Sequence, residues 1–331
     1  MVWDLLILGA GPAGCAAALQ ARRDGLAVLV VEARDADLPA PGETLHPGAE
    51  AVFERLGVSD AVLGAGFHRH RGVWVAWERS SPRVFQPYGS DAAGPWLGFQ
   101  ADRRRLNSIL LATARESGAV VRRGCAPSAP ILRGGRVVGV VLGGEDVEAR
   151  WTVDATGRRG WLACALRLAT LRRSPAMRAR YGWDGGDAPG SGQDPELAAT
   201  STGWRWRAPL GGARSAWVEL AVAAPADGAR SRPGIDVSWR IAERCAGPGF
   251  LLAGDAAAVL DPSSSHGVLR ALLGGLFAAS LAGASAAGRM PDGAVVEAHA
   301  DWTRRWFDAD VEAMRALYRR HACGAVAALF A

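Results

Sequence analysis

The segment GAGPAG, residues 9–14, has the glycine spacing of a pyrophosphate-binding turn. We expect Gly9 to permit the tight turn and Gly11 to let a phosphate approach the backbone. Gly14 would then let a helix pack closely on a strand. On its own this spacing is a weak signal, so the surrounding residues decide its meaning.

Those surroundings favour a dinucleotide site. A helix that begins at Pro12 and Ala13 offers free N–H groups and a partial positive charge to a phosphate. Glu32 follows Gly14 by 18 residues, at the end of the second apolar run, where a carboxylate accepts a hydrogen bond from a ribose hydroxyl. The alternative is a structural glycine turn without a ligand.

Two later segments carry further candidates. VDATG, residues 153–157, ends an apolar run, and LLAGDAAAVLDPSSSHGVLRAL follows at residues 251–272. Asp255 lies at a strand end, where its carboxylate can bind a chain of hydroxyl groups. Pro262 and Gly267 shape a turn whose N–H groups can face an anionic ring at a helix start.

In this order, the three segments resemble the FAD-binding motifs of the flavoprotein monooxygenase superfamily, which has the para-hydroxybenzoate hydroxylase fold. The match runs from Val2 to about Ala287. The resemblance implies that Asp255 holds the ribityl chain of FAD. It also implies that Arg103, in the D-R-x-x-L-N element DRRRLN, contacts the FAD diphosphate. An exposed cation at a helix start is the alternative for Arg103.

The predicted FAD-binding residues are those of the motifs and their neighbours: Gly9, Gly11, Pro12, Ala13, Gly14, Glu32, Ala33, Arg34, Thr44, Arg103, Ala126, Ala155, Thr156, Gly157, Gly254, Asp255, Pro262, Gly267 and Val268.

PGETLHPG, residues 41–48, resembles the G-E-S/T element that flavin halogenases and related flavoproteins place beside the isoalloxazine ring. With DPSSSHGVLRAL, it is most similar to the maturation flavoproteins that act on protein tryptophan during biogenesis of cysteine tryptophylquinone. The catalytic candidates are Glu43, His46 and His266. Either histidine can serve as a base toward an indole N–H or a phenol, or can be a hydrogen-bonded structural residue. Thr44 would contact flavin through its backbone.

The segment GWRWRAPL, residues 203–210, resembles the Trp-x-Trp-x-Ile-Pro signature of flavin halogenases, with Ala208 in place of Ile. Those enzymes use a lysine near the substrate, and an arginine hardly deprotonates and cannot replace it. All 38 basic residues here are arginine, and FHRHRG stands where the lysine is expected. Halogenation is therefore disfavoured. Trp204 and Trp206 either pack a strand against the flavin domain or line an aromatic substrate pocket with His70.

The motifs and the resemblance predict an α/β protein with a Rossmann-like FAD-binding domain, a small, mostly antiparallel β-sheet substrate domain and C-terminal helices. The predicted FAD-binding domain is discontinuous, over residues 1–75, 95–160 and 245–290. Residues 76–94 and 161–244 form the substrate domain, and residues 291–331 form helices. Residues 172–192, rich in Pro, Gly and Asp, are expected to be a loop or lid. His299 and His321 are expected at the surface.

The composition excludes several classes of protein. The net charge of +5 is spread along the chain, which argues against a nucleic-acid partner. Five scattered cysteines without a C-x-x-C pair predict neither a metal site nor a disulfide framework, and they favour the cytoplasm. The uncharged run 271–288 contains many small residues and is expected to be a buried helix rather than a membrane span.

The expected activity is FAD-dependent hydroxylation of an electron-rich aromatic ring, a tryptophan or another indole, with O₂ as oxidant. The alternatives are a flavin oxidase or dehydrogenase, a tryptophan halogenase and a non-enzymatic FAD module. Electrons would come from NAD(P)H or a partner flavin reductase. Fewer than 100 residues separate VDATG from the Gly-Asp motif, which predicts an open site for a ring carried on a peptide or carrier protein. A small free substrate under a lid is the alternative.

Overall fold

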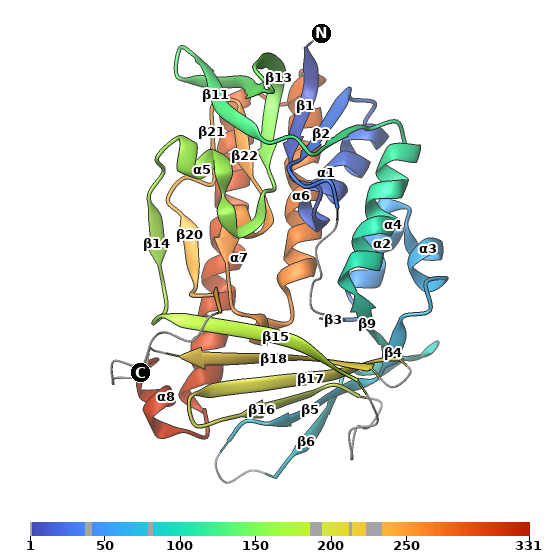
Figure 1. The fold of residues 1–331 in the computed structure, drawn as a ribbon, viewed down its shortest axis with the longest axis vertical. Coiled ribbons are helices and arrows are strands. Elements are labelled where there is room, and N and C mark those ends of the chain that lie inside the picture. Colours follow the sequence, from blue (N-terminus) through green and yellow to red (C-terminus); the bar gives the residue numbers. More distant parts are fainter. Residues whose placement is uncertain (1, 37–41, 79–81, 186–193, 212–213, 223–233) are drawn as a thin grey trace.

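The computed structural model describes residues 2–36, 42–78, 82–185, 194–211, 214–222 and 234–331. A parallel sheet with helices against it lies above a second, mostly antiparallel sheet, and long C-terminal helices run along both (Figure 1). This arrangement confirms the predicted fold class.

The first sheet has the strand order β10-β2-β1-β13-β12-β11. Strand β12 pairs with the first residues of β13, 145–148, and β22 pairs with its last residues, 152–154. Strands β10, β2, β1, β13 and β22 are parallel, whereas β11, β12 and β21 join as antiparallel strands. The bounds are β1 Trp3–Leu8, β2 Val28–Glu32, β10 Val120–Arg123, β11 Pro127–Arg133, β12 Arg136–Leu142, β13 Glu145–Asp154, β21 Ala246–Gly247 and β22 Phe250–Leu252.

Both faces of this sheet are buried, as is typical of parallel strands. In β1, Leu5 and Ile7 pack into the cluster that contains the helices, while Leu6 and Leu8 pack on the opposite side. The helices are α1 Pro12–Arg23, α2 Ala49–Leu56, α3 Ser59–Leu63, α4 Arg103–Glu116, α5 Trp161–Ala165, α6 Gly267–Ala286, α7 Asp292–Arg319 and α8 Gly324–Ala328.

Helix α6 packs directly against α1. A Cβ atom added at Gly275 would lie 1.9 Å from the carbonyl oxygen of Ala13, so only glycine allows this approach. Among the described residues, α6 is the one helix long and apolar enough to cross a membrane, but 56% of its most apolar window is buried within the structure. This packing agrees with the predicted buried helix.

The second sheet has the order β19-β15-β18-β17-β16-β5-β6, antiparallel except between β16 and β5. Its strands are β5 Gly72–Ala76, β6 Val84–Pro87, β15 Met177–Gly185, β16 Glu196–Ala199, β17 Gly203–Gly211, β18 Arg214–Val222 and β19 Ile235–Asp236. Strand β15 corrects the predicted loop at residues 172–192, because it pairs with β18 along its full length. Residues 186–193 of that predicted loop lie outside the described residues.

Small sheets connect the two large ones. Strands β3 Gly42–Leu45, β9 Gly98–Asp102 and β4 His68–His70 form one, and β14 Thr170–Arg172, β20 Arg240–Ala242 and β23 Ala258–Val259 form another. Strands β7 Ser90–Asp91 and β8 Gly94–Pro95 form a short hairpin. In Figure 1 β3, β9 and β4 lie between the lower ends of α4 and α2 and the antiparallel sheet.

The surface placement predicted for two histidines is wrong. His299 is fully buried, and its Nε2 lies 2.8 Å from the carbonyl oxygen of Leu252. His321 is 5% exposed, and its Nε2 lies 2.6 Å from the carbonyl oxygen of Gly203. Both imidazoles tie the C-terminal helical region to strand backbones in the interior.

The α1–α6 contact gives a stability test. Gly275→Ala places a methyl group against the Ala13 carbonyl and should lower the free energy of unfolding by about 1–3 kcal/mol. Gly293→Ala, in α7 with no atom within 4 Å of its new Cβ, is the matched control and should be neutral or stabilising by up to about 1 kcal/mol. Urea unfolding of both variants measures the difference. Equal stabilities would contradict the close packing.

Candidate functional site

The glycines of residues 9–14 each meet a different constraint. Gly9 has a φ of +100°, and a Cβ there would lie 2.4 Å from the carbonyl oxygen of Ala155. A Cβ at Gly14 would lie 1.9 Å from the carbonyl oxygen of Gly9. Gly11 has an ordinary φ of −75° and nothing within 4 Å of an added Cβ. The space before Gly11, at the start of α1, fits an approaching phosphate group.

Glu32 lies at the end of β2, beside this turn. Its Oε2 accepts a hydrogen bond from the Ala10 N–H at 2.9 Å, and its Oε1 accepts one from the Arg34 N–H at 3.1 Å. The side chain stays partly exposed and keeps acceptor capacity for a ribose hydroxyl. Ala33 and Arg34 directly follow β2, and Ala126 lies between β10 and β11.

The VDATG turn is organised by Asp154, which the motif analysis did not single out. This carboxylate is fully buried and accepts hydrogen bonds from the N–H groups of Thr156 and Leu162, at 2.9 and 2.8 Å. Burial raises its pKa, although these hydrogen bonds act in the opposite direction. The turn places Ala155, Thr156 and Gly157 beside the start of α1.

A network of charged groups lies next to this turn. Glu43 pairs with Arg103, and Asp255 lies 3.7 Å from Arg158, with the Arg240 charge also acting on it. Burial raises the pKa of both carboxylates, and the guanidinium groups oppose that rise. Arg240 also lies 3.8 Å from Asp236, and the guanidinium groups of this network suit a diphosphate. Arg158 and Arg240 were missed from the sequence, although Arg158 directly follows VDATG.

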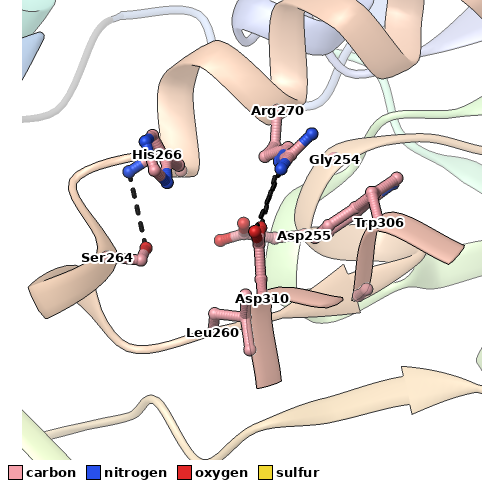
Figure 2. Close-up of a pocket in the computed structure, with 10 residues that line it drawn as sticks. Gly254, Asp255, Leu260, Ser264, His266, Arg270, Trp306 and Asp310 are labelled. Carbon is pink, nitrogen blue, oxygen red and sulfur yellow. Dashed lines mark hydrogen bonds and ion pairs between the residues drawn. The ribbon is translucent and has the colours of Figure 1, made fainter. Parts of the chain in front are cut away.

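His266 directly precedes α6, in the segment that follows the Gly-Asp motif. Figure 2 shows His266 above Ser264, and Arg270 pointing to Asp310, to which its Nε and Nη2 donate at 3.0 Å each. A cavity of about 30 Å³ lies between these side chains and Asp255. That volume suits water rather than an aromatic ring. Asp261, which the sequence analysis passed over, is fully buried and caps the turn at Pro262 through Ser263.

His46 follows β3 and faces His266, with ring centroids 6.2 Å apart. Its Nδ1 accepts a hydrogen bond from the Gly48 N–H at 3.1 Å, so the neutral ring carries its proton on Nε2. Burial lowers the pKa of both His46 and His266 and keeps them neutral near pH 7. Thr44 donates its hydroxyl hydrogen to Gln100, which leaves its backbone as the group that can meet a flavin.

Tyr88, which belongs to none of the sequence motifs, contacts both His46 and His70. The Tyr88 ring lies 5.1 Å from that of His46 and 5.4 Å from that of His70, measured between centroids. His70 is 2% exposed, and burial lowers its pKa. The structure therefore places His46 and His70 against one tyrosine, and His266 against His46.

Trp204 lies elsewhere, in the core beneath the C-terminal helices. It is 1% exposed, and its Nε1 donates to the hydroxyl of Tyr318 at 2.7 Å. Trp206 points to the same side of β17 and packs partly against the same cluster. Arg205 and Arg207 face Glu219 and Asp184 on the opposite side. This placement favours packing over substrate contact for Trp204.

The arrangement of a glycine turn, a β2 carboxylate and a strand-end aspartate defines an FAD-binding oxidoreductase fold. Residues 4–165 match the family of FAD-dependent oxidoreductases. The matched segment contains the glycine turn, Glu32, Arg103 and the VDATG turn.

Individual relatives differ in their reactions. The chain is 28% identical over 318 residues to a tryptophan 2-halogenase of Chondromyces crocatus, covering 83% of this chain and 60% of that protein. It is 30% identical over 165 residues to the 1H-pyrrole-2-carbonyl-(peptidyl-carrier protein) brominase of Pseudoalteromonas luteoviolacea, covering 49% of this chain and 39% of that one. The chain thus spans less than two thirds of the length of both relatives.

A solved structure shares the whole fold. PqsL, described as "a probable FAD-dependent monooxygenase" from Pseudomonas aeruginosa, has a TM-score of 0.82 and 16% identity, covering 100% of this chain and 99% of that one. At this identity the likeness establishes the fold alone.

The phosphate approach can be tested at Gly11. Gly11→Val should leave the protein folded, because its backbone angle is ordinary and the new side chain meets open space. It should weaken FAD binding by at least about tenfold, because the side chain occupies the path of the diphosphate. Flavin absorbance after reconstitution and gel filtration measures this. Gly293→Ala is the control, and wild-type FAD affinity in Gly11→Val would refute the site.

The packing role of Trp204 predicts a different result. Trp204→Phe should cost about 1–3 kcal/mol of stability, because the buried Tyr318 hydroxyl loses its donor. FAD affinity and substrate KM should stay close to wild type. Denaturant unfolding and FAD titration of the same preparation separate the two effects. A large rise in KM at unchanged stability would instead place Trp204 in the substrate pocket.

Proposed function

We propose that the chain is an FAD-dependent monooxygenase that hydroxylates an electron-rich aromatic ring, a tryptophan or another indole. The observation that carries this proposal is the cluster of His46, His266, Tyr88 and His70 beside the start of α6. When bound, FAD supplies the two-electron chemistry that activates O₂. The chain itself binds FAD, excludes water and holds neutral polar groups beside the ring.

The residues divide these tasks. The start of α1, Glu32 and the Arg103 network hold the dinucleotide part of FAD. Asp255 would accept hydrogen bonds from the ribityl hydroxyls, and the N–H groups at the start of α6 would stabilise negative charge on the flavin. His46 offers an Nε2–H donor to a substrate heteroatom.

Halogenation is the second candidate, because the tryptophan 2-halogenase matches over 83% of the chain. Against it stands the absence of any lysine from all 331 residues. At the expected position the structure has His70, a buried imidazole, and Arg71, an exposed guanidinium. Neither group has the chemistry of a lysine amine.

The substrate proposed is a tryptophan or another indole, free or carried on a peptide or carrier protein. The carrier-bound form is supported by the brominase relative, whose name specifies a peptidyl-carrier protein. A protein-borne tryptophan agrees with the resemblance to tryptophylquinone maturation flavoproteins. Electrons would come from NAD(P)H or a separate flavin reductase, and the location would be cytoplasmic.

Mass spectrometry of the product distinguishes these reactions. The FAD-loaded protein, a flavin reductase and heavy-isotope-labelled O₂ are incubated with chloride or bromide and three substrates: free tryptophan, a tryptophan peptide and a carrier-bound ring. Hydroxylation adds one labelled oxygen atom, halogenation replaces hydrogen with halogen, and dehydrogenation removes two hydrogens. Halogenated product without labelled oxygen would overturn the proposal. Omitting the reductase and adding NADH or NADPH identifies the electron source.

A further inference from the structure

Three segments far apart in the sequence converge on the buried side chain of Asp261. Trp239, just before β20, donates its Nε1–H to Asp261 Oδ2 at 2.7 Å. Tyr318, in α7, donates its hydroxyl hydrogen to the same carboxylate. The Tyr318 oxygen in turn accepts a hydrogen bond from Trp204 of β17 at 2.7 Å. All four side chains are at most 1% exposed, so this network lies within the core.

Asp261 is also the first residue of the turn that leads into α6. Its Oδ1 accepts a hydrogen bond from the Ser263 N–H at 2.9 Å. Its carbonyl oxygen accepts one from the Ser264 hydroxyl at 3.3 Å, and that hydroxyl accepts one from the His266 N–H at 3.4 Å. Figure 2 shows Ser264 and His266 on this turn, directly before α6. A short chain of hydrogen bonds therefore joins the buried network to the start of α6.

The turn has a backbone conformation that a serine does not favour. Ser265 has a φ of +53° and a ψ of 12°, in the left-handed region, which is strained for a residue with a Cβ atom. Among the described residues it is one of two non-glycine residues with a positive φ. Such a conformation persists only where the surrounding contacts hold it in place. On this turn those contacts run through Asp261.

Burial and hydrogen bonding act in opposite directions on Asp261. Burial raises the pKa of its carboxyl group, and the donors on Ser263, Trp239 and Tyr318 oppose that rise. Three donors suit the ionised carboxylate, which can only accept. Any other orientation of this side chain would leave a buried donor without its acceptor, which is costly. The carboxylate is therefore fixed, and it fixes the turn that begins with it.

We propose that Asp261 is a positioning residue for the flavin: it holds residues 262–266 so that the N–H groups at the start of α6 are in place to stabilise negative charge on the ring. The inference rests on the FAD site of the proposed function. Reduction of FAD adds electrons to the ring, and correctly placed N–H groups stabilise that charge. The network therefore favours reduced over oxidised FAD. Because Asp261 is fully buried, it acts through the turn and not by contact.

The test compares the reduction potential of bound FAD in wild type, Tyr318→Phe and Asp261→Asn. Tyr318→Phe removes one donor from the carboxylate. In Asp261→Asn the amide NH₂ group meets at least one donor in either orientation, so the turn loses its anchor. In both variants the affinity for reduced FAD should fall about tenfold more than the affinity for oxidised FAD. That factor lowers the two-electron potential by about 30 mV, which equilibration with a redox dye measures.

The sign of the shift separates positioning from a direct effect of charge. Asp261→Asn removes a negative charge, so an electrostatic action on the flavin through space would raise the potential. Loss of positioning lowers it. Hydrogen exchange of residues 263–267, measured without FAD, should also become at least about tenfold faster in both variants. Tyr318→Phe keeps the carboxylate, and with the exchange rates it decides the question if Asp261→Asn does not fold.

Trp204→Phe is the matched control. It removes a buried hydrogen bond from the same tyrosine, but Tyr318 still donates to Asp261, so potential and exchange should stay at the wild-type values. A raised potential in Asp261→Asn, unchanged potential or exchange in Tyr318→Phe, or an equal fall in Trp204→Phe would overturn the positioning role.

The assay needs bound FAD but no oxygen transfer, so its failure is distinct from a failure of the proposed hydroxylation. Wild type that binds no FAD would refute the FAD site and this inference together. Wild type that binds FAD, with variants of unchanged potential, would refute the positioning role alone.

Discussion

The contact between the start of α1 and two other backbone segments is the constraint on which the rest of the structure depends. Gly9 lies against Ala155 of the VDATG turn, Gly14 against the Gly9 carbonyl, and Ala13 against Gly275 of α6. None of these approaches admits a Cβ atom. Segments separated by more than 250 residues are therefore held within van der Waals distance. The candidate FAD-binding segments lie together because α1, the VDATG turn and α6 pack without intervening side chains.

Local motifs explain why the cofactor side could be predicted from the sequence. A glycine turn between two apolar strands specifies its own geometry, so the tight turn at Gly9, the close packing at Gly14 and Glu32 at the end of β2 agree with the spacing. Their contacts to FAD stay predictions. Strand β15 was missed because its order comes from pairing with β18, while its Gly and Asp content indicates a loop. His299 was misplaced because the pattern of a long amphipathic helix does not show which polar residue meets a buried carbonyl.

Tyr88 shows the limit of sequence reasoning most clearly. It follows an exposed edge strand in a segment rich in Pro and Gly, and no motif surrounds it. Its importance comes from three segments that meet in space: the end of β3 with His46, β4 with His70, and the residue after β6. The Tyr88 N–H donates to the Arg71 carbonyl at 2.9 Å, which fixes that residue against β4. Only this tertiary contact reveals the tyrosine.

The charged network around Arg103 and the histidine cluster around Tyr88 differ in their electrostatics, and the difference bears on the proposed reaction. Around Arg103 and Asp255 the groups are charged and paired, which suits a diphosphate and a polyhydroxyl chain. Around Tyr88 burial lowers the pKa of His46, His70 and His266, so these three imidazoles are uncharged near pH 7. A fixed cation there would favour the anionic form of a substrate in the ground state. Neutral imidazoles instead admit a neutral aromatic ring and can hydrogen-bond to its heteroatom without placing a fixed charge beside it.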